Sequence, residues 1–298
     1  MTGSNRAILG LGTATLMPEY GLGAASIDKS EKLYILQAAV GNGVSYIDTA
    51  AAYGESENLL GELRDLLRAY NVRVGTKIAI DSTNPNSDAL LQELEASLRR
   101  LRADTVDSLL LHSAKKGVLV NPAVAEVFGR VRRDGRVCLI GASTYGLDDA
   151  HTAIQLGWCD VIQVEYSILN QSVVRAILPL LREGQELVVR SVLCKGLLTG
   201  RRQNAPTLLR ELGSLIGRLE GIAASWGYTL PELAIRFALD TPRVNIVLVG
   251  VSSIEELNAV LCARDREPLT AEQMRILETF DRSEMDSVHP ERWENISV

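Results

Sequence analysis

The stretch Ser45-Tyr46-Ile47-Asp48-Thr49-Ala50-Ala51-Ala52-Tyr53-Gly54 joins a short apolar run to a polar loop. A strand is expected over Ser45–Asp48, because short apolar or β-branched runs are typical of strands. The amphipathic pattern over Glu57–Tyr70 then predicts a helix. This succession of a short strand and a longer helix recurs along the chain, so it is the unit from which the fold is predicted.

The other elements follow from the same two patterns. The remaining strands are expected at Ala7–Gly12, Val72–Lys77, Ser108–His112, Val137–Ser143, Val161–Glu165, Leu187–Arg190 and Val244–Val249. The remaining helices are expected at Ser30–Asn42, Asp88–Leu101, Pro122–Asp134, Leu147–Leu156, Ser172–Glu183, Pro231–Asp240, Ile254–Cys262 and Ala271–Phe280. Candidate N-caps are Ser30, Ser87, Asn121 and Ser253, whereas Gly135 and Gly184 are expected to end helices in the left-handed conformation.

Eight strand–helix units with nearly continuous apolar strands predict a parallel sheet buried on both faces. Closed on itself, this sheet is a (β/α)8 barrel, and we expect one such domain over residues 1–298. An open doubly wound sheet is the alternative. Its dinucleotide-binding signal is weak here, because Gly10-Leu11-Gly12-Thr13-Ala14 lacks the third glycine of the motif.

Composition excludes several classes of protein. The 298 residues carry a net charge of −6, which disfavours nucleic acid as the main partner. No apolar run is long enough to span a membrane, and Met1 to Arg6 lacks a signal-peptide pattern, so a cytoplasmic protein is expected. The four cysteines show no C-x-x-C spacing and the three histidines no paired spacing, so we expect neither a disulfide framework nor a metal site.

Three expected strands end on polar residues that can take part in catalysis. These residues are Asp48, Lys77 and His112, and the loop after Asp48 presents Tyr53. Alone, each has a simpler interpretation: a solvated lysine, a hydrogen-bonded core histidine or a helix-capping aspartate. In a barrel, however, neighbouring strand ends are neighbours in space, so the four groups are expected to converge at the C-terminal face.

Their chemistry indicates proton transfer. A phenol has a pKa of about 10, and a nearby ammonium group lowers it by stabilising the phenolate. Asp48 would hold Lys77 charged beside Tyr53, and His112 would orient a carbonyl oxygen. A hydride source must then be a cofactor, because no side chain delivers hydride.

The stretch from Ile47-Asp48-Thr49-Ala50 through Tyr53-Gly54-Glu55-Ser56-Glu57 to Leu60-Gly61 resembles the signature of the aldo-keto reductases. The resemblance covers essentially the whole chain. It implies a (β/α)8 barrel, an Asp–Tyr–Lys–His tetrad at Asp48, Tyr53, Lys77 and His112, and NADP or NAD as cofactor. The expected reaction is hydride transfer between nicotinamide and a small carbonyl or alcohol, with Tyr53 as general acid or base.

The resemblance also implies cofactor contacts. They fall at Gly12, Thr13, Asp48, Ser143, Gln163, Arg190, Ser191, Leu193, Lys195, Gly196, Ser252 and Glu256. Two positions depart from the family pattern: Thr144 replaces an asparagine, and Arg190 stands where many members stack an aromatic ring on nicotinamide. A planar guanidinium can also stack.

The cofactor's identity stays open at this point. NADPH is the usual partner of the family, and a 2′-phosphate is commonly held by a basic residue. Here that position is Glu256, which would repel a phosphate but could accept a hydrogen bond from a ribose hydroxyl. NADH is therefore expected to bind no more than modestly weaker than NADPH.

The sequence constrains the substrate less closely, and it leaves two other functions open. The loop after His112 is short and aromatic residues make up only 5% of the chain, which favours a small polar or sugar-like carbonyl substrate. One alternative is a nucleotide-binding regulatory barrel with slow turnover. Another is a Schiff-base aldolase in which Lys77 attacks a carbonyl.

Overall fold

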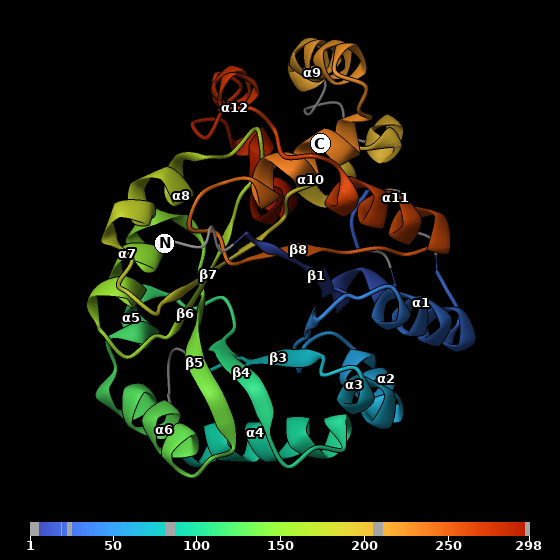
Figure 1. Ribbon diagram of the computed structural model, residues 1–298. Helices are drawn as coiled ribbons and strands as arrows, with labels where there is room; N and C mark the ends of the chain where they lie inside the picture. The colour runs from blue at the N-terminus through green and yellow to red at the C-terminus, as the bar shows by residue number, and fades with distance from the viewer. Residues whose placement is uncertain (1–5, 19, 23–25, 81–86, 205–210, 296–298) are drawn as a thin grey trace, which may run out of the picture.

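The computed structural model describes residues 6–18, 20–22, 26–80, 87–204 and 211–295. Its strands form a closed parallel barrel in sequence order, with β1 paired to both β2 and β8. This confirms the barrel and excludes the open sheet (Figure 1). The strands are β1 (Ile8–Gly12), β2 (Tyr46–Asp48), β3 (Arg73–Ile78), β4 (Val106–Leu111), β5 (Val137–Ser143), β6 (Val161–Glu165), β7 (Glu186–Arg190) and β8 (Ile246–Val249).

Helical segments follow each strand and surround the barrel (Figure 1). The α-helices are α1 (Lys29–Gly41), α2 (Ser56–Glu62), α3 (Arg64–Ala69), α4 (Ser87–Leu101), α5 (Lys116–Leu119), α6 (Pro122–Arg133), α7 (Gly146–Gln155), α8 (Ser172–Ile177), α9 (Gly213–Ser225), α10 (Leu230–Leu239), α11 (Ile254–Asp265) and α12 (Ala271–Glu278). Short 3-10 segments are η1 (Thr13–Leu16), η2 (Leu178–Leu180), η3 (Cys194–Gly196), η4 (Gly200–Asn204), η6 (Asp286–Val288) and η7 (Pro290–Asn295).

The barrel interior is filled by side chains. They come from Tyr46, Leu110, Val161, Val188, Ile246 and Leu248. The Tyr46 ring fits because Gly75 faces it without a side chain: a Cβ at Gly75 would lie 2.2 Å from the Tyr46 hydroxyl. That buried hydroxyl pairs with Ser108 Oγ at 3.0 Å, which satisfies both groups.

A second, larger apolar layer lies between the barrel and the helices. Buried side chains such as Leu36, Leu60, Leu94, Phe128 and Phe237 form it, each almost fully removed from water. Burial of this kind is the main favourable contribution to folding. The barrel is thus rigid and packed, which fixes the positions of the residues at its strand ends.

Two expected helices are shorter than the sequence pattern indicates. The pattern over 57–70 divides into α2 and α3 at Leu63, and nothing in the structure explains the break. The pattern over 172–183 ends at Ile177, because Pro179 lacks the amide hydrogen that would continue the helix. Gly184 is left-handed as expected (φ 79°), but it lies in a turn beyond the helix rather than at its end.

The expected caps have mixed outcomes. Asn121 and Ser253 accept amide hydrogen bonds at the starts of α6 and α11, and Gly135 is left-handed (φ 72°) after α6. Ser30 is not the cap of α1. Asp28, two residues before Ser30, is the cap, because its carboxylate accepts a hydrogen bond from the Glu31 amide. The side chain of Ser87 lies outside the described residues.

No helix in the described part of the chain has both the length and the apolar character needed to cross a membrane.

Candidate active site

The barrel register brings the expected polar strand ends together. Asp48 ends β2 opposite Gly75 of β3, and Lys77 of β3 pairs with Leu110 of β4. His112 follows β4 directly, with its amide donating to the Ile78 carbonyl at 2.8 Å. The three side chains therefore lie at the same C-terminal end of adjacent strands, as the sequence predicts.

Lys77 is the centre of this group and is 1% exposed. Its Nζ lies 2.5 Å from Asp48 Oδ2 and donates to the Thr49 carbonyl at 2.8 Å. Burial alone would lower the pKa of Lys77, but the ion pair with Asp48 outweighs it, so the pKa lies above its usual value. The ammonium is therefore the resident form.

Tyr53 lies on the loop between β2 and α2. Its hydroxyl is 3.5 Å from Lys77 Nζ, and its ring makes an edge contact with His112 at 5.4 Å between centroids. The loop is anchored behind the site by Glu57, a buried carboxylate of α2 that accepts from Thr76 Oγ1 at 2.5 Å and Arg100 Nε at 2.6 Å. Thr76 precedes Lys77 on β3, so one carboxylate fixes both elements that carry the phenol and the ammonium.

His112 is held as a neutral ring. Burial, together with the positive charges of Lys77 and Arg190, lowers its pKa to about 4. A neutral imidazole beside the Tyr53 ring can donate one hydrogen bond without adding charge to the site.

Asp48 is also bound from the opposite side. Gln163 Nε2 of β6 donates to Asp48 Oδ1 at 2.9 Å. The remaining Gln163 oxygen and the Thr144 hydroxyl are buried and have no hydrogen-bond partner among the described residues. Buried polar atoms without partners are unfavourable, so each of the two leaves a hydrogen bond to be made.

A cavity of about 430 Å³ opens beside this group. Of the residues expected to bind cofactor, those that line it are Gly12, Asp48, Arg190, Ser191, Leu193, Lys195, Gly196 and Glu256. Thr13, Ser143, Gln163 and Ser252 are buried and stand behind this lining. Thr13, for example, donates to the Asp48 carbonyl and Thr49 Oγ1, so it supports the end of β2.

The loop after β7 has an unusual backbone. Ser191, Cys194 and Lys195 have φ of 62°, 48° and 49°, and Gly196 has φ of 102°. Non-glycine residues in this region are strained, and such strain is concentrated at ligand-binding segments. Ser191, Lys195 and Gly196 of this strained loop line the cavity.

The lining of the cavity also contains a charge pair. Arg201 of η4 lies against Glu256 of α11 and also donates to Ser252 Oγ. The second Glu256 oxygen accepts from the Ser252 amide at 2.8 Å. Glu256 is therefore neutralised by protein donors, which its position in the sequence does not reveal.

The sequence model of the Aldo/keto reductase family matches residues 8–282. The chain belongs to this family. It is accordingly an NAD(P)H-dependent oxidoreductase, with NADP(H) or NAD(H) as cofactor.

Individual relatives of the reductase are distant but cover most of its length. It is 27% identical to "Aldo-keto reductase YhdN" of Bacillus subtilis, over 87% of this chain and 85% of that protein. It is 28% identical to the "NADH-specific methylglyoxal reductase" of Escherichia coli, over 74% of this chain and 78% of that protein. The solved structure of aldo-keto reductase AKR11C1 from Bacillus halodurans shares the fold, with a TM-score of 0.73, 23% identity and coverage of 92% of each chain.

Sequence reasoning missed three side chains of this reductase: Tyr20 and Arg201, which line the cavity, and Tyr145, which packs on Arg190. The Arg190 guanidinium lies 4.1 Å from the Tyr145 ring centroid, and Lys195 Nζ lies 5.6 Å from that of Tyr20. Burial raises the pKa of Tyr20 to about 12, so its hydroxyl stays protonated. Because these contacts join loops from different units, the linear sequence carries no motif for them.

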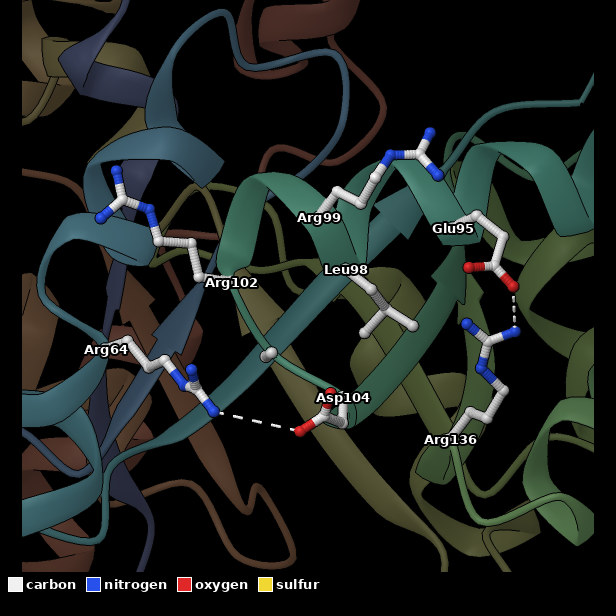
Figure 2. A pocket seen from close by; sticks show the side chains of 8 residues that line it. Arg64, Glu95, Leu98, Arg99, Arg102, Asp104 and Arg136 are labelled. Carbon is white, nitrogen blue, oxygen red and sulfur yellow. Dashed lines mark hydrogen bonds and ion pairs between the residues drawn. The ribbon is translucent and has the colours of Figure 1, made fainter.

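Another hollow of the reductase, of about 590 Å³, lies near the opposite end of the barrel (Figure 2). It is lined by Arg64, Glu95, Leu98, Arg99, Arg102, Ala103, Asp104 and Arg136. Arg136 pairs with Glu95 and Arg64 with Asp104, while Arg99 and Arg102 extend in different directions. Side chains that do not converge form no binding site, and residues at this end of such barrels serve stability.

Proposed function

We propose that the reductase interconverts a small carbonyl compound and its alcohol, with Tyr53 as the general acid or base. The observation that carries this proposal is the position of Lys77 Nζ, which contacts Asp48 at 2.5 Å and the Tyr53 hydroxyl at 3.5 Å. A nicotinamide cofactor supplies or accepts the hydride when bound. The residues of the chain move the proton.

Each polar residue has a separate part in that proton transfer. Asp48 keeps Lys77 charged, and the ammonium stabilises the negative charge that forms on the Tyr53 oxygen when it gives up its proton. His112, neutral because burial lowers its pKa to about 4, donates a hydrogen bond to the substrate oxygen beside Tyr53. Together the two donors orient the carbonyl.

The same geometry argues against a Schiff-base aldolase. A lysine must be deprotonated to attack a carbonyl. Pairing with Asp48 raises the pKa of Lys77 despite burial, and its protons are directed to Asp48 and Thr49. We infer that Lys77 does not act as a nucleophile.

The residues around the cavity suit a dinucleotide. Gln163, which donates to Asp48, and Thr144, which is bonded to the Gln163 carbonyl, have unpartnered polar atoms that a carboxamide group could satisfy. Lys195 and Arg201 place positive charge along the same cavity, where a pyrophosphate would need it. Arg190, packed on Tyr145, presents a flat guanidinium on which the nicotinamide could stack.

The Arg201–Glu256 pair bears on the choice between NADH and NADPH. If the 2′-phosphate lies at this loop, as the family resemblance implies, it must displace Glu256 from Arg201 and Ser252. The free energy lost with that ion pair offsets the free energy gained from the new contacts with the phosphate. We therefore infer that NADH binds no more than modestly weaker than NADPH, as the sequence predicts.

We infer that the substrate is small and polar or sugar-like. The lining of the cavity that contains Tyr53 also includes the polar side chains of Tyr20, Arg190 and Lys195. The Escherichia coli relative is named for methylglyoxal, a small polar carbonyl. Larger apolar ketones would leave these polar groups without partners.

A carbonyl panel tests the proposal. Aldoses, keto-sugars, methylglyoxal and aromatic aldehydes are each assayed with NADH and NADPH in parallel. We expect turnover of at least one small polar carbonyl with either cofactor. Tight cofactor binding without multiple turnover of any member would instead favour the alternative, a nucleotide-binding regulatory barrel.

A further inference from the structure

A group of potential metal ligands lies beside the barrel mouth and outside the proton-transfer group. Glu165 ends β6, and His289 and Glu291 belong to the C-terminal segment that includes η6 and η7. One ligand atom from each of the three lies within 4.8 Å of the others. Glu165 and His289 are 2% and 4% exposed, whereas Glu291 is partly exposed.

Two buried oxygens at this place lack hydrogen-bond donors among the described residues. They are Glu165 Oε2 and Asn170 Oδ1. The other Glu165 oxygen accepts from the Gly146 amide at 3.1 Å, and Asn170 Nδ2 lies 3.3 Å from His289 Nδ1. Rotation of the Asn170 amide exchanges its oxygen and nitrogen, which places the unpartnered oxygen beside the same histidine nitrogen. Unpartnered buried acceptors call for a cation or a donor between them.

The histidine is oriented as metal-bound histidines are. His289 Nε2 lies 2.8 Å from the Ser283 carbonyl, to which it can donate. This bond selects the tautomer that leaves a lone pair on Nδ1, and a backbone carbonyl is a common partner of metal-binding histidines. The lone pair then faces the group containing Glu291, whose Oε1 is 3.4 Å away.

These separations match a small metal ion. Zinc bonds of about 2.0–2.1 Å in tetrahedral geometry place neighbouring ligand atoms roughly 3.3 Å apart. The distances from His289 Nδ1 are 3.4 Å to Glu291 Oε1 and 3.3 Å to the Asn170 amide. Glu165 requires a small shift of its carboxylate to complete the set.

We propose that Glu165, Asn170, His289 and Glu291 form a binding site for a divalent transition-metal ion, with Zn²⁺ as the best match. The nitrogen and carboxylate donors are those that zinc uses in proteins. The sequence predicts no such site, because its ligands come from three separated segments and no two histidines are paired in spacing.

Two arginines contact the carboxylates of this site. Arg190 lies 3.6 Å from Glu165 Oε2 and Arg292 lies 3.8 Å from Glu291 Oε1. Arg190 keeps its bond to the Thr144 carbonyl at 2.8 Å and its contact with Tyr145, so a metal ion would not leave it without partners. The bound ion would compete with both arginines for negative charge, which limits its affinity to a moderate one.

The site would fix the C-terminal segment to the barrel. His289 and Glu291 flank Pro290, whose carbonyl accepts from Lys195 Nζ at 3.3 Å. A metal that joins Glu165 to these residues would therefore hold the segment beside the loop after β7. Because the ligands are together only in the folded chain, binding stabilises the fold.

The test is a Zn²⁺ titration of the full chain after removal of metals with a chelator, without an affinity tag. The exposed Cys138 and Cys262 are first replaced by serine, because thiolates also bind zinc. We expect one Zn²⁺ per chain and a higher melting temperature. His289→Gln and Glu291→Gln should each weaken binding by at least ~10-fold. His151→Gln, at a histidine far from the site in sequence, is the matched control and should leave binding unchanged.

A protonated His289 paired with Glu291 is the competing arrangement. It predicts no stoichiometric Zn²⁺ binding and no rise in melting temperature, and that result would overturn the proposal. Equal Zn²⁺ affinity in the parent, His289→Gln and Glu291→Gln would also overturn it. If His289→Gln does not fold, the partly exposed Glu291→Gln carries the test alone.

Discussion

Lys77 is the residue through which the proton-transfer group is connected, because its ammonium contacts both Asp48 and Tyr53. Residues of this kind could be predicted from sequence: Asp48 and Lys77 end short apolar runs, His112 follows one, and Tyr53 stands at a fixed distance after Asp48. Barrel closure then makes them neighbours. Tyr20, Tyr145 and Arg201 could not be predicted, since each meets its partner only where loops from different units fold together.

At the level of single residues, His112 gives a pH prediction. Its pKa is about 4 in the folded protein, through burial and the charges of Lys77 and Arg190, against 6.5 ordinarily. The unfolded chain therefore takes up a proton in this window that the folded chain does not, so stability falls as pH drops from 6.5 toward 4. NMR titration should show the His112 ring neutral down to near its pKa. A midpoint near 6.5 would contradict this account.

The Arg201–Glu256 pair gives a second residue-scale prediction. Glu256→Gln should release Arg201 for a 2′-phosphate and raise the affinity for NADPH relative to NADH by about tenfold. Charge-assisted hydrogen bonds contribute roughly 1.5–3 kcal/mol, which supports a change of that size. Arg201→Gln should lower the affinity for NADPH relative to NADH. Fluorescence titration with both cofactors measures the two affinities, with Glu255→Gln as the matched control.

If the ratio of NADPH to NADH affinity is the same in Glu256→Gln, Arg201→Gln and the parent, the pair does not lie at the 2′-phosphate. That outcome would leave the proposed carbonyl chemistry unaffected, because the proton transfer depends on Tyr53 and Lys77 and not on this pair.

Among the elements, helix α2 is held close to α4 at Gly61. A Cβ at Gly61 would lie 2.1 Å from the Arg100 carbonyl, a backbone atom that cannot move aside. Gly61→Ala should therefore destabilise the fold by roughly 1–3 kcal/mol, and it should disturb the neighbouring loop that carries Tyr53. Gly217→Ala in α9 is the matched control, because nothing lies within 4 Å of its Cβ position.

We expect Gly217→Ala to be neutral or to stabilise by up to about 1 kcal/mol, as alanine favours a helix over glycine. Chemical denaturation of both variants measures the difference. Equal stability of Gly61→Ala and the parent would show that α2 and α4 are not tightly packed at this point.

The strands could be predicted to within one or two residues, but the helices less well. Helix α9 was not expected, because Gly213, Gly217 and Gly221 each weaken an isolated helix. It forms because Leu215, Ile216, Leu219 and Ala223 are buried against the core. Tertiary packing thus outweighs local propensity there, and a single sequence does not report that packing.

For the molecule as a whole, the repeated strand–helix unit was sufficient to predict barrel closure, and closure explains why the polar strand ends form one site. The C-terminal segment could not be predicted in this way. It returns to the barrel mouth through His289 and Pro290, whose contacts with Asn170 and Lys195 depend on the finished fold. The position of this segment is therefore a property of the folded molecule.

The central claim is that Tyr53 transfers the proton during carbonyl reduction, and Tyr53→Phe tests it most directly. Stopped-flow measurement of a single turnover, with the fastest substrate of the carbonyl panel, follows oxidation of the bound reduced cofactor. We predict a rate lower by at least ~100-fold, within the usual contribution of a general acid, with cofactor affinity unchanged by fluorescence titration. A Tyr53→Phe variant that reduces the substrate at the parent rate would contradict the account.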